Sequence, residues 1–172
     1  LRDPVTLARP WAIPGTPGLA HRIGGLEKQD GTGDVSYDTE NHGLMVDLRA
    51  AKIAGIADDI PDAFVDEEEG AELLLVGWGS TKGVNDAGVG RVRARGRKVA
   101  QMHLVHLNPF PHNVGEVLRR YAKVLVSEMN KGQLSRLLRA EFLVDAQSLT
   151  KVKGIPFRAA EVEAKLMEVL DA

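Results

Sequence analysis

The stretch "ELLLVGWGSTKG", residues Glu72 to Gly83, decides the fold class of the chain. Its first half is a short, continuously apolar run, which is typical of a strand covered on both faces of a sheet. A tight turn follows, with Ser80 placed to cap a helix that we expect to run from residue 80 to 95. A buried strand, a turn and a helix in this order favour an α/β protein.

The residues on both sides of this stretch repeat the alternation of strands and helices. We expect further strands at 98–107, 123–127 and 148–153, and further helices at 40–56, 114–121, 133–142 and from Pro156 onward. In the last helix the apolar side chains recur at helical spacing, at Val162, Leu166, Val169 and Leu170. Short connections between such elements indicate a three-layer, Rossmann-like, doubly wound and mostly parallel sheet of about five strands.

The N-terminal residues 1–38 have a different composition, rich in Pro, Gly and Asp. They predict an extended arm with at most one hairpin, around "HRIGGLEK", and a turn-rich loop at "QDGTGD". We expect this arm to link a preceding domain to an α/β domain over residues 39–172. Because the chain begins with Leu1 in a loop-like stretch rather than with Met, we interpret it as a piece of a longer polypeptide.

The helix that follows the arm has a recognisable start. Asp38 or Thr39 can cap it, because short polar side chains accept hydrogen bonds from the first turn. Leu44, Leu48 and Ala51 recur at helical spacing and predict a buried face. Beyond this helix, the acidic run from Asp66 to Glu69 is typical of a solvated loop.

Composition and charge exclude several classes of function. Of the 172 residues, 44% are apolar and 27% are charged, which is typical of a soluble globular domain. The formal net charge of −2 predicts no nucleic-acid partner. The one basic cluster, Arg91 to Lys98, is better placed to close a helix, because cations are stabilised at a helix C-terminus. The sequence has no apolar run long enough to span a membrane.

The chain contains no cysteine. Disulfides, a cysteine nucleophile and a thiolate-bound iron–sulfur cluster are therefore excluded within it. There is also no signal-peptide pattern. We expect a cytoplasmic location, with which both observations agree.

Nucleotide and metal motifs are incomplete. In "GWGSTKG" the order Thr81-Lys82-Gly83 is not that of a phosphate-binding Walker loop, and Lys82 stands where a dinucleotide fingerprint needs glycine. His103 and His106 are three residues apart in an expected strand, so their side chains should point to opposite faces. We therefore expect no nucleotide, no metal and no complete catalytic constellation in this chain.

One polar segment lies where doubly wound sheets place their sites. In "VSEMNKGQLSRLL", residues 126–138, a strand ends in Glu128, and a loop with Asn130 and Gly132 leads to a helix that begins near Gln133. Ligands of such sheets bind beyond the carboxyl ends of the strands. Glu128, Asn130, Gly132 and Gln133 are therefore the candidate loop or interface residues. We expect Glu128 and Asn130 to fix the loop through hydrogen bonds to backbone groups around Gly132 and Gln133.

Six stretches taken together resemble the α subunit of the 2-oxoacid:ferredoxin oxidoreductases. In chain order they are "PGLAHRIGGLEKQDGTG", "NHGLMVDLRAAKI", "LLVGWGSTKG", "HLVHLNPFP", "VSEMNKGQL" and "VKGIPF", and they cover nearly the whole chain. The pair "HLNPFP" and "VSEMNKGQL" is most similar to the 2-oxoglutarate branch. The resemblance is to the C-terminal part of that subunit, a domain similar to the C-terminal domain of transketolases.

This resemblance implies an enzyme that decarboxylates a 2-oxoacid on thiamine diphosphate, gives an acyl-CoA and reduces ferredoxin through a [4Fe–4S] cluster. It implies that the diphosphate, Mg²⁺ and cluster are held largely by a β subunit. This segment would then be mainly structural, with no catalytic, cofactor-binding or metal-binding residue of its own. Its loop from Glu128 to Gln133 would lie near the subunit interface or at the edge of the active-site entrance, with direct contact to substrate or coenzyme A as the alternative. The alternative is a flavodoxin-like module that binds FMN or another nucleotide, which would need a phosphate loop.

Overall fold

The computed structural model describes residues 1–22 and 24–172 and divides into two compact units, residues 1–60 and 61–172. The division falls after Ile60 rather than after residue 38, because the helix expected to open the α/β domain packs with the N-terminal segment. Ile23, inside the expected "HRIGGLEK" hairpin, lies outside the described residues. The two units are described separately.

The first unit is built around helix α1, Thr39–Ala54, which a short 3₁₀ helix, Gly55–Asp59, extends. Asp38 caps α1 by accepting a hydrogen bond from the backbone N–H of Asn41 at 2.7 Å, as the sequence predicts. The predicted buried face was wrong. The side chains that α1 buries are Asn41 and Met45, whereas Leu44 is 47% exposed. Periodicity misleads here because the polar Asn41, which the pattern does not count, makes the main contact.

Asn41 holds the preceding loop against α1. Its side-chain amide donates to the Lys28 carbonyl at 2.9 Å and accepts from the Asp30 N–H at 2.9 Å. An antiparallel bridge between Lys28 and Val35 closes the loop "QDGTGD" between them. The turn-rich loop is therefore the tip of a short hairpin, fixed by one buried amide.

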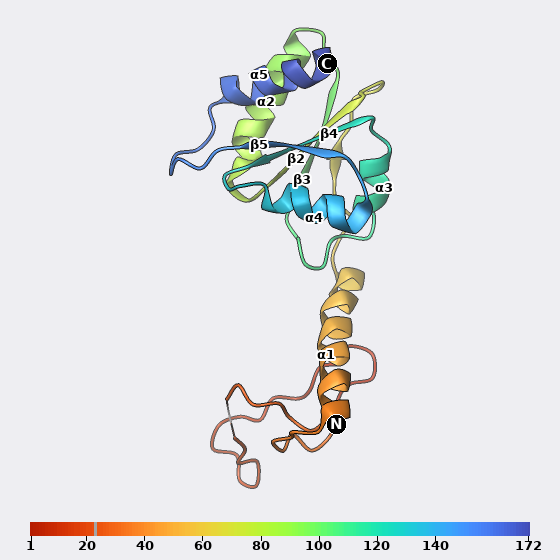
Figure 1. Ribbon diagram of the computed structural model, residues 1–172, viewed down its shortest axis with the longest axis vertical. Helices are drawn as coiled ribbons and strands as arrows, with labels where there is room; N and C mark the ends of the chain where they lie inside the picture. The colour runs from red at the N-terminus through yellow and green to blue at the C-terminus, as the bar shows by residue number, and fades with distance from the viewer. Residues whose placement is uncertain (23) are drawn as a thin grey trace. The chain divides into compact units, whose positions relative to one another are not determined.

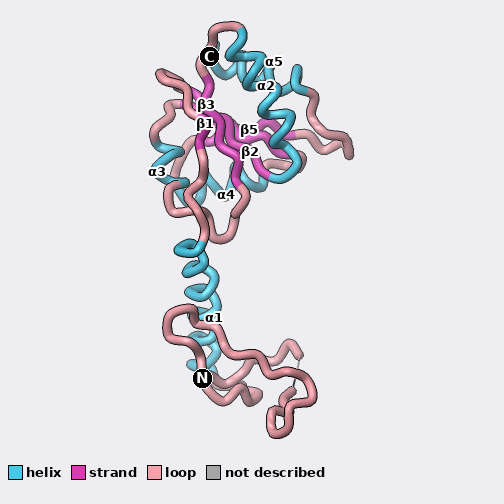
Figure 2. Tube along the Cα trace, turned by 180° about the vertical axis from the view of Figure 1, so that it is seen from behind, coloured by secondary structure: helices cyan, strands magenta, loops and turns pink. Residues whose placement is uncertain are grey.

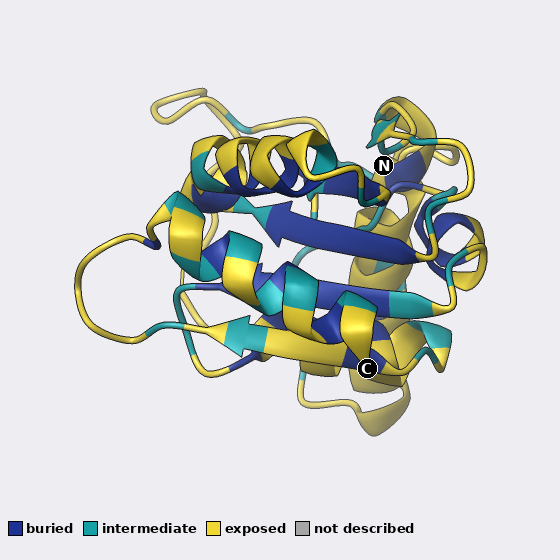
Figure 3. Cartoon of the chain, turned by 90° about the horizontal axis from the view of Figure 1, so that it is seen from above, coloured by how far each residue is buried: buried dark blue, intermediate teal, exposed yellow. Residues whose placement is uncertain are grey.

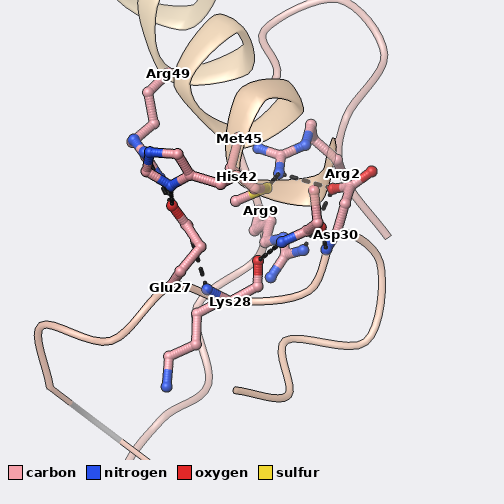
Figure 4. Close-up of polar contacts among 9 residues, drawn as sticks. Arg2, Arg9, Glu27, Lys28, Asp30, His42, Met45 and Arg49 are labelled. Carbon is pink, nitrogen blue, oxygen red and sulfur yellow. Dashed lines mark hydrogen bonds and ion pairs between the residues drawn. The ribbon is translucent and has the colours of Figure 1, made fainter. Parts of the chain in front are cut away.

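Two partly buried carboxylates complete this unit (Figure 4). Glu27 pairs with His42 at 2.8 Å and with Arg49 at 3.1 Å. Asp30 pairs with Arg2 at 3.0 Å and with Arg9 at 3.5 Å. The hydrogen bonds from Arg49 and His42 lower the pKa of Glu27 to about 2. This unit is therefore held largely by polar contacts near its surface.

The second unit contains one five-stranded sheet, in the order β1-β3-β2-β4-β5. Its strands are β1 Val65–Asp66, β2 Leu73–Trp78, β3 Val99–Leu104, β4 Lys123–Glu128 and β5 Ala146–Thr150. The pairs β2–β3, β2–β4 and β4–β5 are parallel, and the two-residue strand β1 is antiparallel to β3. The mostly parallel sheet predicted from the sequence is confirmed.

Helices cover both faces of this sheet (Figures 1 and 2). The helices are α2 Lys82–Ala94, α3 Val114–Arg119, α4 Gln133–Phe142 and α5 Ala159–Asp171. One core, containing Val89 and Val162, lies under α2 and α5, and the other, containing Val117 and Leu138, lies under α3 and α4. Figure 3 shows buried central strands between helices that are exposed on their outer side. The architecture is the three-layer α/β arrangement that the alternating pattern indicates.

A close contact between α2 and α5 depends on one glycine. A Cβ atom at Gly88 would lie 2.6 Å from Cγ1 of Val162. Gly88 is therefore a packing residue, and its helix-weakening effect is offset by the contact that it permits. A helix is predicted from the sequence at these residues, and the contact with α5 gives the physical reason why a glycine stands there.

Three predicted element bounds were wrong. Strand β3 ends at Leu104 rather than at residue 107, and strand β5 spans residues 146–150 rather than 148–153. Pro156 lies before α5, which begins at Ala159, so it does not form the first turn. Strand ends depend on how far the neighbouring strand extends, and the periodicity of a single segment does not contain that information.

The acidic run is mostly exposed, and residues 67–69 lie outside any strand or helix, so the predicted solvated loop is confirmed for these residues. Asp66 belongs to β1 and pairs with Arg93 at 2.8 Å, and Glu68 pairs with the same guanidinium at 2.9 Å. Glu67 pairs with Arg120 at 3.2 Å. The ion pairs themselves were not predicted, because the partner arginines lie 25 or more residues away along the chain.

Candidate functional site

The switch point of the sheet lies between β2 and β4. From β2 the chain passes through α2 to β3 on one side, and from β3 it passes through α3 to β4 on the other side. Such a reversal opens a crevice at the carboxyl ends of the two central strands. Here it is a shallow cavity of about 300 Å³, which we call the switch-point crevice, lined by Trp78, Gly79, Ser80, Thr81, Met129, Asn130 and Gln133.

Glu128 lies at the end of β4, beside this crevice, and is fully buried. Its two carboxylate oxygens accept hydrogen bonds from the backbone N–H groups of Leu134 at 2.7 Å and Ser135 at 2.9 Å. Both donors belong to the first turn of α4, where N–H groups have no partner within the helix. A negative charge is also stabilised at this end of a helix. Glu128 therefore acts as an internal cap for α4.

Asn130 caps the same turn from the loop. Its side-chain oxygen accepts from the N–H of Gly132 at 2.8 Å and from the N–H of Gln133 at 2.9 Å. The predicted hydrogen bonds of Asn130 to these two groups are confirmed. Glu128 reaches farther than predicted, to Leu134 and Ser135, because its side chain is longer and starts from inside the sheet.

Gly132 is required by the turn. Its φ of 81° lies in the left-handed region, and a Cβ atom there would lie 3.0 Å from Oγ of Ser135. The hydroxyl of Ser135 donates to the Gly132 carbonyl at 3.1 Å and accepts from the Ser148 hydroxyl at 2.6 Å. Gln133, in contrast, contributes its backbone N–H to the cap and leaves its side chain exposed. The four candidate residues are thus brought together in one hydrogen-bonded turn, to which Gln133 contributes only its backbone N–H.

These contacts decide what the crevice can bind. The N–H groups of residues 132, 133, 134 and 135 are those that a phosphate would use at a helix N-terminus. All four donate to the chain's own Asn130 and Glu128. A phosphate would also meet the buried negative charge of Glu128. The site therefore does not fit a diphosphate or a flavin phosphate.

The turn after β2 is also closed by its own side chains. The hydroxyl of Thr81 accepts from the Trp78 N–H at 3.1 Å and donates to the Trp78 carbonyl at 2.8 Å. Sequence analysis assigned the capping role to Ser80, which was wrong, since Ser80 is exposed and its hydroxyl contacts the sulfur of Met129 at 3.8 Å. Thr81 closes the turn through its two hydrogen bonds to the Trp78 backbone and makes no side-chain cap to α2.

A buried polar pair, Asn85 on α2 and Ser127 on β4, was not predicted from the sequence. The side-chain amide of Asn85 donates to the Ser127 hydroxyl at 2.7 Å, and this hydroxyl donates back to the amide oxygen at 3.0 Å. Both residues are fully buried, and they join α2 to β4. A Cβ atom at Gly77 would lie 2.3 Å from this amide, so the pair needs glycine there. The available signal was the position of Asn85 on the stripe of α2 that also carries Val89 and Val92.

The histidines do not form a metal site among the described residues, where no suitable group of His, Cys, Asp or Glu is found. His103 belongs to β3, but His106 lies beyond its end and is exposed. The expectation that both stand in one strand was therefore wrong. His103 points to the face of the sheet covered by α2.

The basic cluster at the end of α2 is largely neutralised within the chain. Arg91 and Arg95 pair with Glu163 at 3.5 and 2.6 Å, and Arg97 pairs with Asp171 at 2.6 Å. Two of its cations lie in the last turn of α2, as predicted for a helix C-terminus. In the described part of the chain no helix is long and apolar enough to cross a membrane.

The fold and the capped switch point define a Rossmann-like α/β domain whose helix N-terminus is used for packing rather than for phosphate binding. Residues 71–163, more than half of the chain, match the family described as pyruvate:ferredoxin oxidoreductase core domain II, and the chain belongs to this family.

Two curated relatives extend this result. The chain is 60% identical over 162 residues, 94% of its length, to the 2-oxoglutarate oxidoreductase subunit KorA of Mycobacterium tuberculosis (strain ATCC 25618 / H37Rv). It is 34% identical over 122 residues, 67% of its length, to the 2-oxoacid:ferredoxin oxidoreductase 1 subunit alpha of Aeropyrum pernix. The chain spans only 24% and 19% of the lengths of these two relatives.

Solved structures agree on the fold. The chain superposes with a TM-score of 0.84 and 33% identity on the 2-oxoglutarate:ferredoxin oxidoreductase of Magnetococcus marinus, a structure with 2-oxoglutarate, coenzyme A and succinyl-CoA bound. The match covers 96% of this chain and 29% of that one. A split-gene transketolase, an inactive β4 tetramer, matches 63% of this chain and 41% of its own with a TM-score of 0.50 and 16% identity, which supports the fold alone. The expected similarity to transketolase domains is confirmed at the level of the fold.

Proposed function

We propose that the chain works as part of the α subunit of a 2-oxoacid:ferredoxin oxidoreductase of the 2-oxoglutarate type. The observation that carries this proposal is the 60% identity with the mycobacterial 2-oxoglutarate oxidoreductase subunit over 94% of the chain. The Magnetococcus marinus enzyme supports the choice of substrate, because its structure has 2-oxoglutarate, coenzyme A and succinyl-CoA bound. The complete enzyme would be a heteromer with a β subunit, located in the cytoplasm.

The proposed reaction joins a decarboxylation to an oxidation. 2-Oxoglutarate and coenzyme A give succinyl-CoA, CO₂ and one proton, and the two electrons released reduce ferredoxin. Thiamine diphosphate, when bound with Mg²⁺, supplies the carbanion chemistry that decarboxylation of a 2-oxoacid needs. The residues of this chain fit neither that cofactor nor a [4Fe–4S] cluster, since the α4 cap takes the phosphate position and the sequence has no cysteine. We therefore assign these groups to other domains or to the β subunit.

The contribution of this chain to such an enzyme is structural. Glu128, Asn130 and Gly132 hold the turn between β4 and α4 in one conformation, and Gln133 presents its side chain outward from that turn. A rigid turn at the carboxyl end of the sheet suits a surface that contacts a neighbouring domain or subunit. We therefore interpret these four residues as loop or interface residues and not as ligands of the oxoacid or of coenzyme A.

The flavodoxin-like alternative is not supported by the geometry. An FMN module holds the flavin phosphate with free backbone N–H groups at a strand-to-helix turn. At α4 these groups donate to Asn130 and Glu128, and at the turn after β2 the hydroxyl of Thr81 closes the loop. The oxidoreductase proposal needs no phosphate site in this chain and agrees with both turns.

The proposal is tested with the complete α subunit that carries this sequence, purified together with its β subunit under anaerobic conditions. We expect reduction of ferredoxin that requires both 2-oxoglutarate and coenzyme A, with succinyl-CoA as the product. Pyruvate is the matched control substrate and should give at least tenfold lower kcat/KM. Preferred turnover of pyruvate would assign the chain to another branch of the family. Turnover of no 2-oxoacid by a folded complex would refute the proposal.

A further inference from the structure

The segment between β5 and α5 is exposed in its middle and buried at both ends. Residues 152–156 are all exposed, and in Figure 1 they form the loop that projects between the end of β5 and the start of α5. At one end the side chain of Lys151 is only 9% exposed, and at the other end Phe157 lies in the core under α2 and α5. We call residues 151–157 the β5–α5 strap. It carries "VKGIPF", one of the stretches that resemble the family.

Lys151 fastens both ends of the strap. Its backbone N–H donates to the Glu128 carbonyl at 3.0 Å, which fixes the start of the strap to the end of β4. Its Nζ atom donates to the Pro156 carbonyl at 3.0 Å and to the two carboxylate oxygens of Glu161 at 3.0 and 2.8 Å. An ammonium group has three N–H donors, so each of them finds an acceptor here. The same side chain therefore also fixes the far end of the strap.

Glu161 holds this fastening from the first turn of α5. Its carboxylate also accepts from the backbone N–H of Arg158 at 2.6 Å. The hydrogen bond from Lys151 is the largest cause that lowers the pKa of Glu161, so the carboxylate is ionised at neutral pH. An ion pair with one nearly buried member is costly to break, because the remaining charge is left in a poorly solvated place. The Lys151–Glu161 pair therefore joins the strap to α5 more firmly than a surface ion pair would.

The middle of the strap has no fastening of its own. In the part of the chain that the structure describes, the backbone N–H groups of residues 152–155 donate no hydrogen bond to a backbone carbonyl. Between the strap and α5 lies a cavity of about 500 Å³, lined in part by Lys151, Phe157 and Glu161. Exposed backbone with few hydrogen bonds opens locally at a lower free energy than a packed strand does. The strap is therefore expected to stay closed only as long as its ends are held.

We propose that the β5–α5 strap opens as a local unit and that the Lys151–Glu161 ion pair keeps it closed. Opening separates residues 152–156 from α5 and joins the cavity to solvent, while the sheet and its two cores stay folded. The cores allow this, because Phe157 is the one strap residue among their described members. Such opening is a conformational device within the α/β unit, and it does not depend on the proposed function.

The test uses hydrogen exchange, followed by mass spectrometry, on the full-length protein that carries this sequence. Lys151→Met removes the ammonium group and keeps an apolar stem over the ring of Phe157. We expect the amides of residues 152–161 to exchange at least tenfold faster, with the amides of β2 and β4 unchanged. Lys165→Met is the matched control, since Lys165 pairs with Glu168 on the same helix, and it should leave exchange in the strap unchanged.

Glu161→Gln tests the same ion pair from the other side. It removes the negative charge and keeps an oxygen that can accept from the N–H of Arg158, so we expect faster exchange in the strap, by a smaller factor than for Lys151→Met. Unchanged exchange of the strap in both variants would overturn the inference, because the strap would then be held by something other than this pair. Faster exchange that spreads to β2 and β4 would also overturn it, because the pair would then support the whole unit and not a local opening.

Discussion

Glu128 and Glu27 are two carboxylates held in opposite ways. Glu128, in the α/β unit, is fully buried and accepts two hydrogen bonds from backbone N–H groups of α4. Glu27, in the N-terminal unit, pairs with the side chains of His42 and Arg49, which are themselves 66% and 54% exposed. A carboxylate bonded to buried backbone stabilises the fold, because removing it leaves unsatisfied donors, whereas an exposed ion pair is screened by water and salt. The two units should therefore respond very differently to matched substitutions.

The largest effect is expected for Glu128→Ala. It leaves the N–H groups of Leu134 and Ser135 buried without an acceptor, and each such group costs about 1 to 3 kcal/mol. We expect the free energy of unfolding to fall by about 2 to 6 kcal/mol in urea denaturation, since two groups are affected. Glu128→Gln, which keeps one acceptor oxygen, should lose less. Glu141→Gln, on the exposed side of α4, is the control, and an equal effect there would show that the cap has been misjudged.

A smaller effect is expected for Asn130→Ala, because its two acceptor bonds go to a turn that is partly exposed. We expect a loss of about 1 to 3 kcal/mol in stability or in subunit association, with little change in KM for the oxoacid or for coenzyme A. Melting temperature, complex formation and steady-state kinetics, all measured on this variant, distinguish a structural role of Asn130 from direct contact with a ligand. A stable complex with KM raised about tenfold would mean that Asn130 contacts a ligand.

The third effect in size is expected in the hydrogen exchange of the N-terminal segment. Trp11 is 95% exposed and Val5 is 87% exposed, and this unit buries few apolar side chains. Amides of residues 1–22 should therefore exchange quickly in the chain alone and at least tenfold more slowly in the complete complex, where other surfaces can cover them. Strand β4, which is buried, provides the internal reference. Equal exchange of residues 1–22 in both states would contradict this expectation.

The smallest effect concerns Glu27 and pH. Its pKa is lowered to about 2 by Arg49 and His42, so its contribution to stability is present above pH 4.5 and is lost as the pH falls toward 2. Because the carboxylate is not buried, we expect this loss to be shallow and to weaken further with added salt. In an NMR titration Arg49→Met should raise the pKa of Glu27, and Lys52→Gln, three residues farther along α1, should leave it unchanged. A titration that Arg49→Met does not move would show that the pair is not formed in solution.

The sequence by itself determined the class of fold, the cap of α1 at Asp38 and the turn bonds of Asn130, although it assigned the turn after β2 to Ser80 instead of Thr81. Continuous apolar runs predict buried strands, and helical spacing predicts α4 at residues 133–142, the bounds that the structure shows. The hydrogen bonds of Asn130 were also predictable, since donor and acceptor are two or three residues apart. Such contacts are local, and the residue types within a few positions are enough to specify them.

Only the tertiary structure decided the contacts between distant segments. The pairing of Asn85 with Ser127 spans 42 residues, and that of Arg93 with Asp66 spans 27. The glycine at position 77 acquires a meaning only when α2 lies over the sheet. In the α/β unit periodicity identifies which residues face inward. It does not identify the residue that each of them contacts, because that partner depends on strand order and on the packing of helices across the sheet.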